Sequence, residues 1–134
     1  KRGTASKYYY KIIPKQFSTK TVLDREDFMK AGKAASLCSK NGLFDVSLTF
    51  EPASGEIRVQ ATDATRGDNI SACQAEISGQ SNTVSVNYRY LLDGLQAISD
   101  EKVNFEMIDA SNPCLVSPVG TKEAYRYVLM PIRQ

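Results

Sequence analysis

The chain has 134 residues, of which 42% are hydrophobic and 24% charged, and its formal net charge is +2. This composition is ordinary for one globular domain, and so small a charge excess does not by itself predict a nucleic-acid partner. The chain contains no histidine, which excludes a Ser-His-Asp triad, a Cys-His dyad and a histidine zinc site. No apolar run approaches the roughly 18 residues that a membrane-spanning helix needs, so we expect no membrane partner.

The first half of the chain predicts a strand, a helix and three more strands. Residues 1–7 are small, polar and basic, and we expect a flexible lead-in or a remnant of cloning. β-Branched residues predict a strand over Thr19–Leu23. Acidic residues then predict a helix that begins at Asp24 and ends at Asn41-Gly42. Apolar alternation predicts the three strands, over Phe44–Phe50, Glu56–Asp63 and Ile70–Ile77.

The second half repeats this order. A short strand is expected over Thr83–Val86, and Asn87 can cap a helix whose leucines recur at spacings of three and four, up to Ser99-Asp100. Three strands follow, over Val103–Ile108, Cys114–Val119 and Tyr125–Met130. The chain therefore predicts an α+β fold of two β-α-β-β-β units, residues 19–79 and 80–134. Their two helices should pack on one face of an antiparallel sheet.

The three cysteines, Cys38, Cys73 and Cys114, lie far apart in the sequence and form no CxxC motif. Zinc ribbons and thioredoxin-like motifs are therefore excluded. An odd number of cysteines favours reduced, buried thiols in the cytoplasm. We expect neither a metal nor a cofactor.

Three segments carry a resemblance to a known family. Val86–Leu95 has an Asn-x-x-Tyr-Leu-Leu-Asp helix start, Ser111–Pro113 forms a turn two strands later, and Tyr127–Arg133, before the final Gln134, has an aromatic-Val-x-Met-Pro-aliphatic-Arg pattern. Together they resemble the carboxy-terminal third domain of the bacterial β sliding clamp, the processivity ring of DNA polymerase III. The segment YYYKIIPK is similar to the family's link from the middle domain, so residues 8–18 read as an interdomain linking segment and residues 8–134 as the clamp domain.

The resemblance implies the DNA-clamp fold and a non-catalytic role in bacterial DNA replication. Such a ring encircles duplex DNA without reading its sequence. It tethers polymerases, the clamp loader and repair proteins through their clamp-binding-motif peptides. The resemblance also implies a homodimer for the full-length protein, a monomer for the isolated domain, and a cytoplasmic location at replication forks on the nucleoid.

Matching positions imply a peptide pocket in which Met130 supplies an adaptable apolar wall and Pro131 turns the tail. Without the family, Asn87 reads first as a helix cap, Tyr90 as a half-buried aromatic and Met130 as a core residue. The residues that the resemblance assigns to this pocket are Lys11, Ile12, Leu43, Asn87, Tyr90, Ser111, Pro113, Val128, Leu129, Met130, Pro131, Ile132 and Arg133.

The resemblance implies two further surfaces on the helices. Basic residues there would contact the DNA backbone, namely Lys30, Lys33, Lys40 and Arg89. Ser36 and Leu37 would lie at the ring interface with the first domain of a second subunit. Leu37 falls off the apolar stripe of its helix, so we expect it to be exposed.

Two other functions stay open. The chain could be a protein-interaction domain of similar fold with no replication role. It could also be an enzyme that uses carboxylates such as Asp63 and Asp68, which lie near one predicted turn, although no cofactor motif accompanies them.

Overall fold

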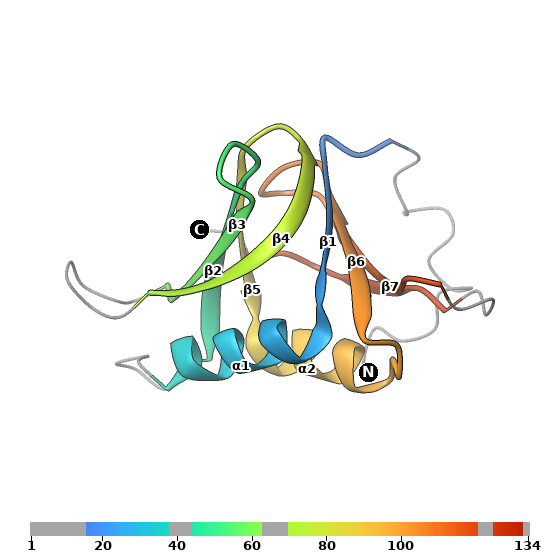
Figure 1. The fold of residues 1–134 in the computed structure, drawn as a ribbon. Helices are drawn as coiled ribbons and strands as arrows, with labels where there is room; N and C mark the ends of the chain where they lie inside the picture. The colour runs from blue at the N-terminus through green and yellow to red at the C-terminus, as the bar shows by residue number, and fades with distance from the viewer. Residues whose placement is uncertain (1–15, 38–43, 63–69, 121–124, 133–134) are drawn as a thin grey trace.

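A computed structural model describes residues 16–37, 44–62, 70–120 and 125–132. In these segments eight strands form one antiparallel sheet, and two helices lie together against one face of it (Figure 1). The first unit comprises β1 (Thr19–Asp24), α1 (Arg25–Ser36), β2 (Asp45–Glu51), β3 (Glu56–Ala61) and β4 (Ser71–Gly79). The second comprises β5 (Asn82–Asn87), α2 (Tyr88–Gln96), β6 (Lys102–Met107), β7 (Cys114–Pro118) and β8 (Tyr127–Leu129). The predicted α+β fold with a doubled β-α-β-β-β order is confirmed.

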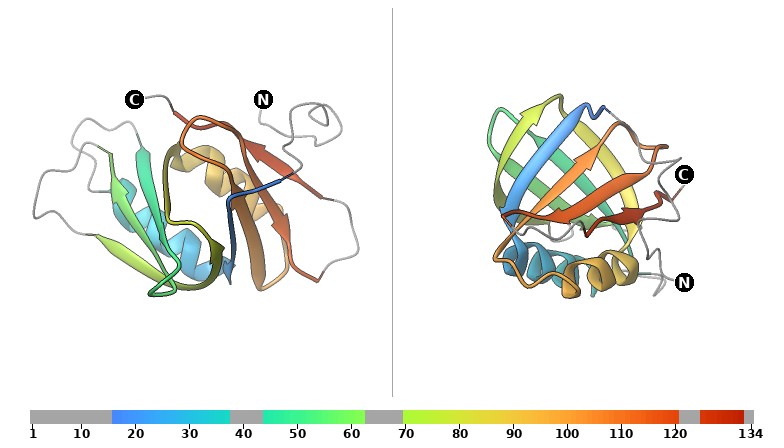
Figure 2. Two further views of the ribbon diagram at one scale, coloured as in Figure 1. Left: turned by 90° about the horizontal axis from the view of Figure 1, so that it is seen from above. Right: turned by 90° about the vertical axis from the view of Figure 1, so that its right-hand side faces the viewer.

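The strand order is β5-β2-β3-β4-β1-β6-β7-β8, so the two units meet through β1 and β6 and through β2 and β5. The sheet curls over the helices and brings its two edge strands towards each other (Figure 2). Between those edges, the backbone N–H of Ile132 donates a hydrogen bond of 2.8 Å to the carbonyl of Ser85 in β5. The residues after β8 thereby attach to the opposite edge of the sheet.

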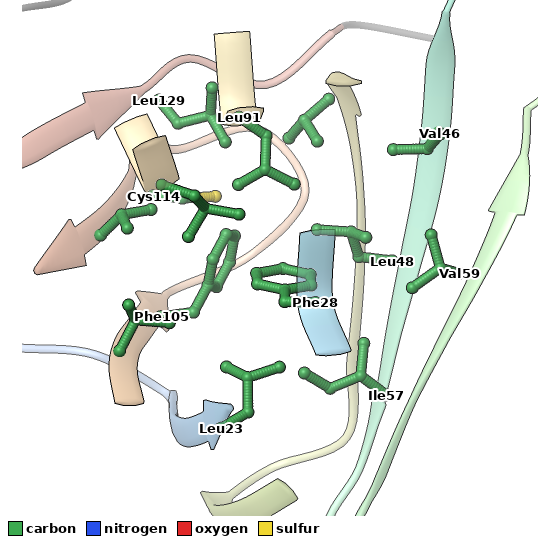
Figure 3. Close-up of a cluster of buried hydrophobic side chains, with 14 of the residues drawn as sticks. Leu23, Phe28, Val46, Leu48, Ile57, Val59, Leu91, Phe105, Cys114 and Leu129 are labelled. Atoms are coloured by element: carbon green, nitrogen blue, oxygen red, sulfur yellow. The ribbon is translucent and has the colours of Figure 1, made fainter. Parts of the chain in front are cut away.

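Alternation along the strands places one set of apolar side chains beneath the helices. In β6, Val103, Phe105 and Met107 are fully buried, as predicted. Phe105 lies edge-on to Phe28 of α1, with ring centroids 5.9 Å apart, and stacks on Phe50 of β2 at 5.3 Å. Figure 3 shows Phe28 and Phe105 among aliphatic side chains from both units. One continuous core therefore joins the two units.

Both helices begin at a side-chain cap. The carboxylate of Asp24 accepts a hydrogen bond of 3.0 Å from the N–H of Asp27, so Asp24 ends β1 and caps α1 instead of forming its first turn. The Asn87 side chain accepts hydrogen bonds from the N–H groups of Arg89 and Tyr90, at 2.8 and 3.2 Å. The predicted cap at Asn87 is confirmed, and it fixes where the first turn of α2 lies.

Several predicted boundaries were wrong. α1 ends at Ser36, well before Asn41-Gly42. The Ser36 hydroxyl donates a hydrogen bond of 2.9 Å to the Lys33 carbonyl, and a serine side chain that bonds to the backbone in this way competes with the hydrogen bonds of the helix. α2 ends at Gln96, although Ile98 beyond it is still buried. Phe44 lies outside β2 with a φ of +61°, a conformation that takes it off the strand. Strand β8 covers three residues, because the chain after Leu129 turns towards β5.

The thiols of Cys73 and Cys114 are buried and free, as predicted; Cys38 lies outside the described residues. Burial raises the pKa of the Cys73 thiol to about 11, with further contributions from Asp27 and Asp24, and raises that of Cys114 to about 12. At pH 8, about one Cys73 side chain in a thousand should therefore be in the reactive thiolate form, and the thiolate fraction of Cys114 should be smaller still.

We expect neither thiol to react with a disulfide reagent in the native Cys38→Ser variant at pH 8, whereas two equivalents should react in denaturant. The variant removes the one cysteine outside the described residues, so each equivalent is assigned. Rapid native labelling of Cys73 or Cys114, followed by mass spectrometry, would contradict the burial.

A glycine lets α2 approach the sheet closely. A Cβ at Gly94 would collide with the ring of Tyr127 in β8, and that ring is itself buried. Gly94→Ala should therefore push β8 away. The gain in helix propensity offsets part of the strain, leaving a net loss of about 1–2 kcal/mol in the free energy of unfolding by urea. The neighbouring exposed position gives the control, because Asp93→Ala should cost less than about 0.5 kcal/mol. Equal effects of the two substitutions would exclude the close approach.

Candidate functional site

The chain after β8 forms the first part of the candidate site. The β7–β8 register begins with the pair Cys114–Leu129; Pro113 comes directly before this pair in the chain and Met130 directly after it. Met130 is 56% exposed, so it is not a core residue, while Leu129 before it is buried. Pro131 and Ile132 are half-buried, and the Ile132–Ser85 hydrogen bond fixes their path. A large apolar side chain is thus held at the surface on a well-positioned backbone.

The N-terminus of α2 supplies the second part. Ser85 lies two residues before the cap Asn87, so the tail reaches β5 close to the point where α2 begins. Tyr90 in the first turn is 57% exposed, which corrects the expectation of a half-buried aromatic. Met130, two residues before Ile132, and Tyr90, five residues after Ser85, are therefore exposed side chains on the two segments that the Ile132–Ser85 hydrogen bond joins.

The turn before β7 supplies the third part, and Asp109 organises it. The Asp109 carboxylate accepts hydrogen bonds from the backbone N–H groups of Ser111 and Asn112, at 2.9 and 3.1 Å, and from both of their side chains. These hydrogen bonds lower the pKa of Asp109 below its usual range. Ser111 is exposed and Pro113 half-buried, and the turn leads directly into β7, the strand that pairs with β8.

Val128 differs from the exposed residues of the predicted pocket. Its side chain is 4% exposed, opposite a buried Leu115 on β7. Val128 and Leu129 are therefore both buried, in contrast to the exposed Met130 that follows them. Four predicted pocket residues lie outside the described residues: Lys11, Ile12, Leu43 and Arg133.

The basic residues of the helices line a groove between α1 and α2, with a volume of about 440 Å³. Lys30 and Lys33 come from α1 and Arg89 from α2, and all three are exposed. The Arg89 guanidinium lies over the Phe44 ring, 4.5 Å from its centroid. Lys40 lies outside the described residues.

The two predicted ring-interface residues differ in exposure. Leu37 is 74% exposed at the end of α1, as expected from its position off the apolar stripe. Ser36 is 7% exposed, and its hydroxyl is engaged with the Lys33 carbonyl. Only Leu37 of this pair presents its side chain to solvent.

The family was tested with comparisons to known proteins. A family model described as "DNA polymerase III beta subunit, C-terminal domain" matches residues 10–133. The chain belongs to this family. It therefore belongs with the bacterial sliding clamps, and the residues that match include the tail, the cap and the Asp109 turn described above.

Individual sliding clamps agree. The chain is 29% identical over 126 residues to the beta sliding clamp of Caulobacter vibrioides and 27% identical over 127 residues to that of Synechocystis sp.. The matched region covers 93% of this chain in both comparisons, but only 33% of the Caulobacter clamp and 32% of the Synechocystis clamp. The chain thus spans about a third of the length of these curated relatives.

Solved structures show the same fold. The beta subunit from Thermotoga maritima superposes with a TM-score of 0.84 at 24% identity, covering 94% of this chain and 34% of that one. A sliding clamp from Pseudomonas aeruginosa bound to griselimycin gives 0.83 at 25% identity, covering 94% and 33%. The DNA-clamp fold expected from the sequence is confirmed.

The described segments contain no group of three or more His, Cys, Asp and Glu side chains that could hold a metal ion. Within the same segments, neither helix is long and apolar enough to cross a bilayer. The carboxylates of Asp63 and Asp68, considered for an enzyme, lie outside the described residues.

Sequence reasoning missed two residues that build the site, Ser85 and Asp109. Asp109 could have been found, because residues 109–113 read Asp-Ala-Ser-Asn-Pro, and Asp, Ser, Asn and Pro gathered in so short a segment are a common turn signal. Ser85 acts through its backbone carbonyl, which carries no side-chain signature, so only the folded sheet identifies it.

Asp109 makes the turn sensitive to pH. Because its pKa is lowered in the folded state, Asp109 contributes stability above its ordinary pKa near 3.8, and this contribution is lost as the pH falls through the folded-state value. Asp109→Asn keeps an acceptor but removes the charge. The melting temperature should fall by about 1–2 °C at pH 7, since solvent screens an exposed carboxylate.

The difference between wild type and Asp109→Asn should shrink as the pH is lowered, because the wild-type carboxylate is then protonated. Differential scanning calorimetry between pH 7 and strongly acidic pH measures this difference. A difference that stayed constant, or grew towards acid, would contradict the role of the charge.

Proposed function

We propose that this chain is the carboxy-terminal third of a bacterial replication sliding clamp and that its tail holds clamp-binding-motif peptides. The single observation that carries the proposal is the exposed Met130, which lies on a tail hydrogen-bonded to β5, the strand that leads into the helix of Tyr90, in a chain that belongs to the clamp family. A thioether wall adapts to leucine or phenylalanine anchors, which suits one surface to several different partners.

The polar residues suit the same role. Ser111 is exposed on the Asp109 turn, and its hydroxyl, which donates to Asp109, can accept a hydrogen bond at the rim; the Tyr90 hydroxyl lies on an exposed side chain and can accept or donate one. Lys11, Ile12, Leu43 and Arg133 remain part of this proposal. Residues 8–18 are proposed as the link from a middle domain, which would supply the other wall of the pocket.

The remaining roles concern the full-length protein. We propose that it forms a homodimeric ring around duplex DNA, with Lys30, Lys33, Lys40 and Arg89 facing the phosphates and Leu37 near the contact with a second subunit. The three described cations share one face, which is the arrangement that sequence-independent backbone contact requires. Such a ring acts in the cytoplasm at replication forks, and its contribution to synthesis is tethering instead of catalysis.

Titration with a Gln-x-x-Leu-Phe peptide, followed by NMR, tests the pocket. Chemical shifts should change at Tyr90, Pro113 and Met130, and Met130→Ala should weaken binding by about tenfold through loss of an apolar contact. Ile70→Ala is the matched control, because Ile70 is a large apolar residue of similar exposure, 53% against 56%, outside the site. Its effect should be below about twofold.

Two results would count against the proposal. One is an equal loss of affinity in Met130→Ala and Ile70→Ala. The other is the absence of peptide binding both by this chain and by the full-length protein that contains it.

A further inference from the structure

The groove between α1 and α2 has an apolar floor that contact with DNA phosphates leaves unexplained. Met29, Phe44 and Leu92 line it as half-buried side chains, and Leu37 at one end is 74% exposed. Backbone contact with a duplex needs cations and no apolar surface. Apolar residues gathered in a groove of about 440 Å³ are instead typical of a site that takes a side chain or a small ligand.

The rim of the groove carries positive charge. Lys30, Lys33 and Arg89 line it, and among its described lining residues Glu26 is the one acid. The Glu26 carboxylate is already paired with Arg25, at 2.9 Å. The N-terminal end of α2, where Arg89 lies, adds the positive end of the helix dipole. An anionic partner is therefore the one that matches the charge of this groove.

The aromatic residues of the groove favour a peptide over an unpaired nucleobase. Bases bind single-stranded sites by stacking on free aromatic faces. Tyr88 is 6% exposed and its hydroxyl donates 2.8 Å to the Met29 carbonyl, while the Phe44 ring is covered by Arg89. The other apolar lining residues are Met29, whose sulfur accepts a hydrogen bond of 3.3 Å from Arg25, and the aliphatic Leu37 and Leu92, and such side chains suit aliphatic anchors.

We propose that the groove between α1 and α2 binds an acidic peptide segment, which inserts a leucine, methionine or phenylalanine between the helices and pairs its carboxylates with Lys30, Lys33 and Arg89. This site is separate from the tail. Arg89 and Leu92 line the flank of α2 that faces α1, whereas Gly94 meets Tyr127 of β8 on another flank. The inference does not rest on the tail's function. If the full-length ring also uses these cations for DNA and Leu37 for its subunit contact, the duplex and the second subunit compete with the peptide for them.

The probe is a synthetic peptide in which leucines recur at helical spacing among glutamates, and its control is a scrambled peptide of the same composition. NMR titration of the chain should shift resonances of Met29, Phe44 and Leu92, more strongly with the patterned peptide than with the scrambled one. Affinity should fall with added salt, because surface ion pairs are screened.

Matched variants separate local charge from net charge. Lys30→Gln with Lys33→Gln should weaken binding by about fivefold, the sum of two exposed ion pairs. Lys20→Gln with Lys102→Gln removes the same charge from exposed positions on β1 and β6 and should change affinity by less than about twofold. Leu37→Ser tests the apolar contact. Its side chain is largely exposed, so the fold should be retained while peptide affinity falls by about threefold or more.

Three results would overturn the proposal: equal losses in the two charge pairs, peptide-induced shifts confined to Met130 and Tyr90, or a single-stranded oligonucleotide that shifts the groove residues at lower concentration than the peptide. Titration with the Gln-x-x-Leu-Phe peptide distinguishes this proposal from the one for the tail. If the acidic peptide binds the groove but the Gln-x-x-Leu-Phe peptide does not bind the tail, only the tail proposal fails.

Discussion

Two helices must cover one face of eight strands, and this requirement shapes the rest of the molecule. The helices are short, twelve and nine residues, so a flat sheet of this width would leave apolar side chains uncovered. The sheet curls instead, and its edge strands β5 and β8 approach each other until Ile132 reaches Ser85. Glycine at position 94 permits the close contact of α2 with β8 that this curvature needs. The position of the tail therefore follows from the curvature that lets two short helices cover the core.

The elements that the sequence predicts best are those whose burial is periodic. β2, β3 and β6 alternate between buried and more exposed positions, and the apolar letters alone identify them. The cap at Asn87 is equally predictable from the sequence, because a helix cap needs only its own side chain and the backbone N–H groups two and three residues later. These features depend on local chemistry, which the sequence contains in full.

Other features depend on contacts that are distant in the chain. The sequence alone favours Met130 as a core residue, and only the turn of the tail towards β5 exposes it. Phe44 looks like part of a strand until Arg89 and the start of α2 are placed beside it. The family resemblance identified Met130 where periodicity could not. The groove between the helices is a property of two packed elements and has no signature in either segment alone.

The doubled pattern in the sequence does not mark a modular boundary in the fold. Asn82, which begins the second unit, donates hydrogen bonds to Thr19 of the first and to the Ile108 carbonyl of the second. β1 and β2 each pair with a strand of the other unit along most of their length. Residues 19–79 taken alone would expose two unpaired strand edges and two of the three clustered phenylalanines, Phe28 and Phe50, so the halves are interlocked and neither is a self-sufficient folding unit.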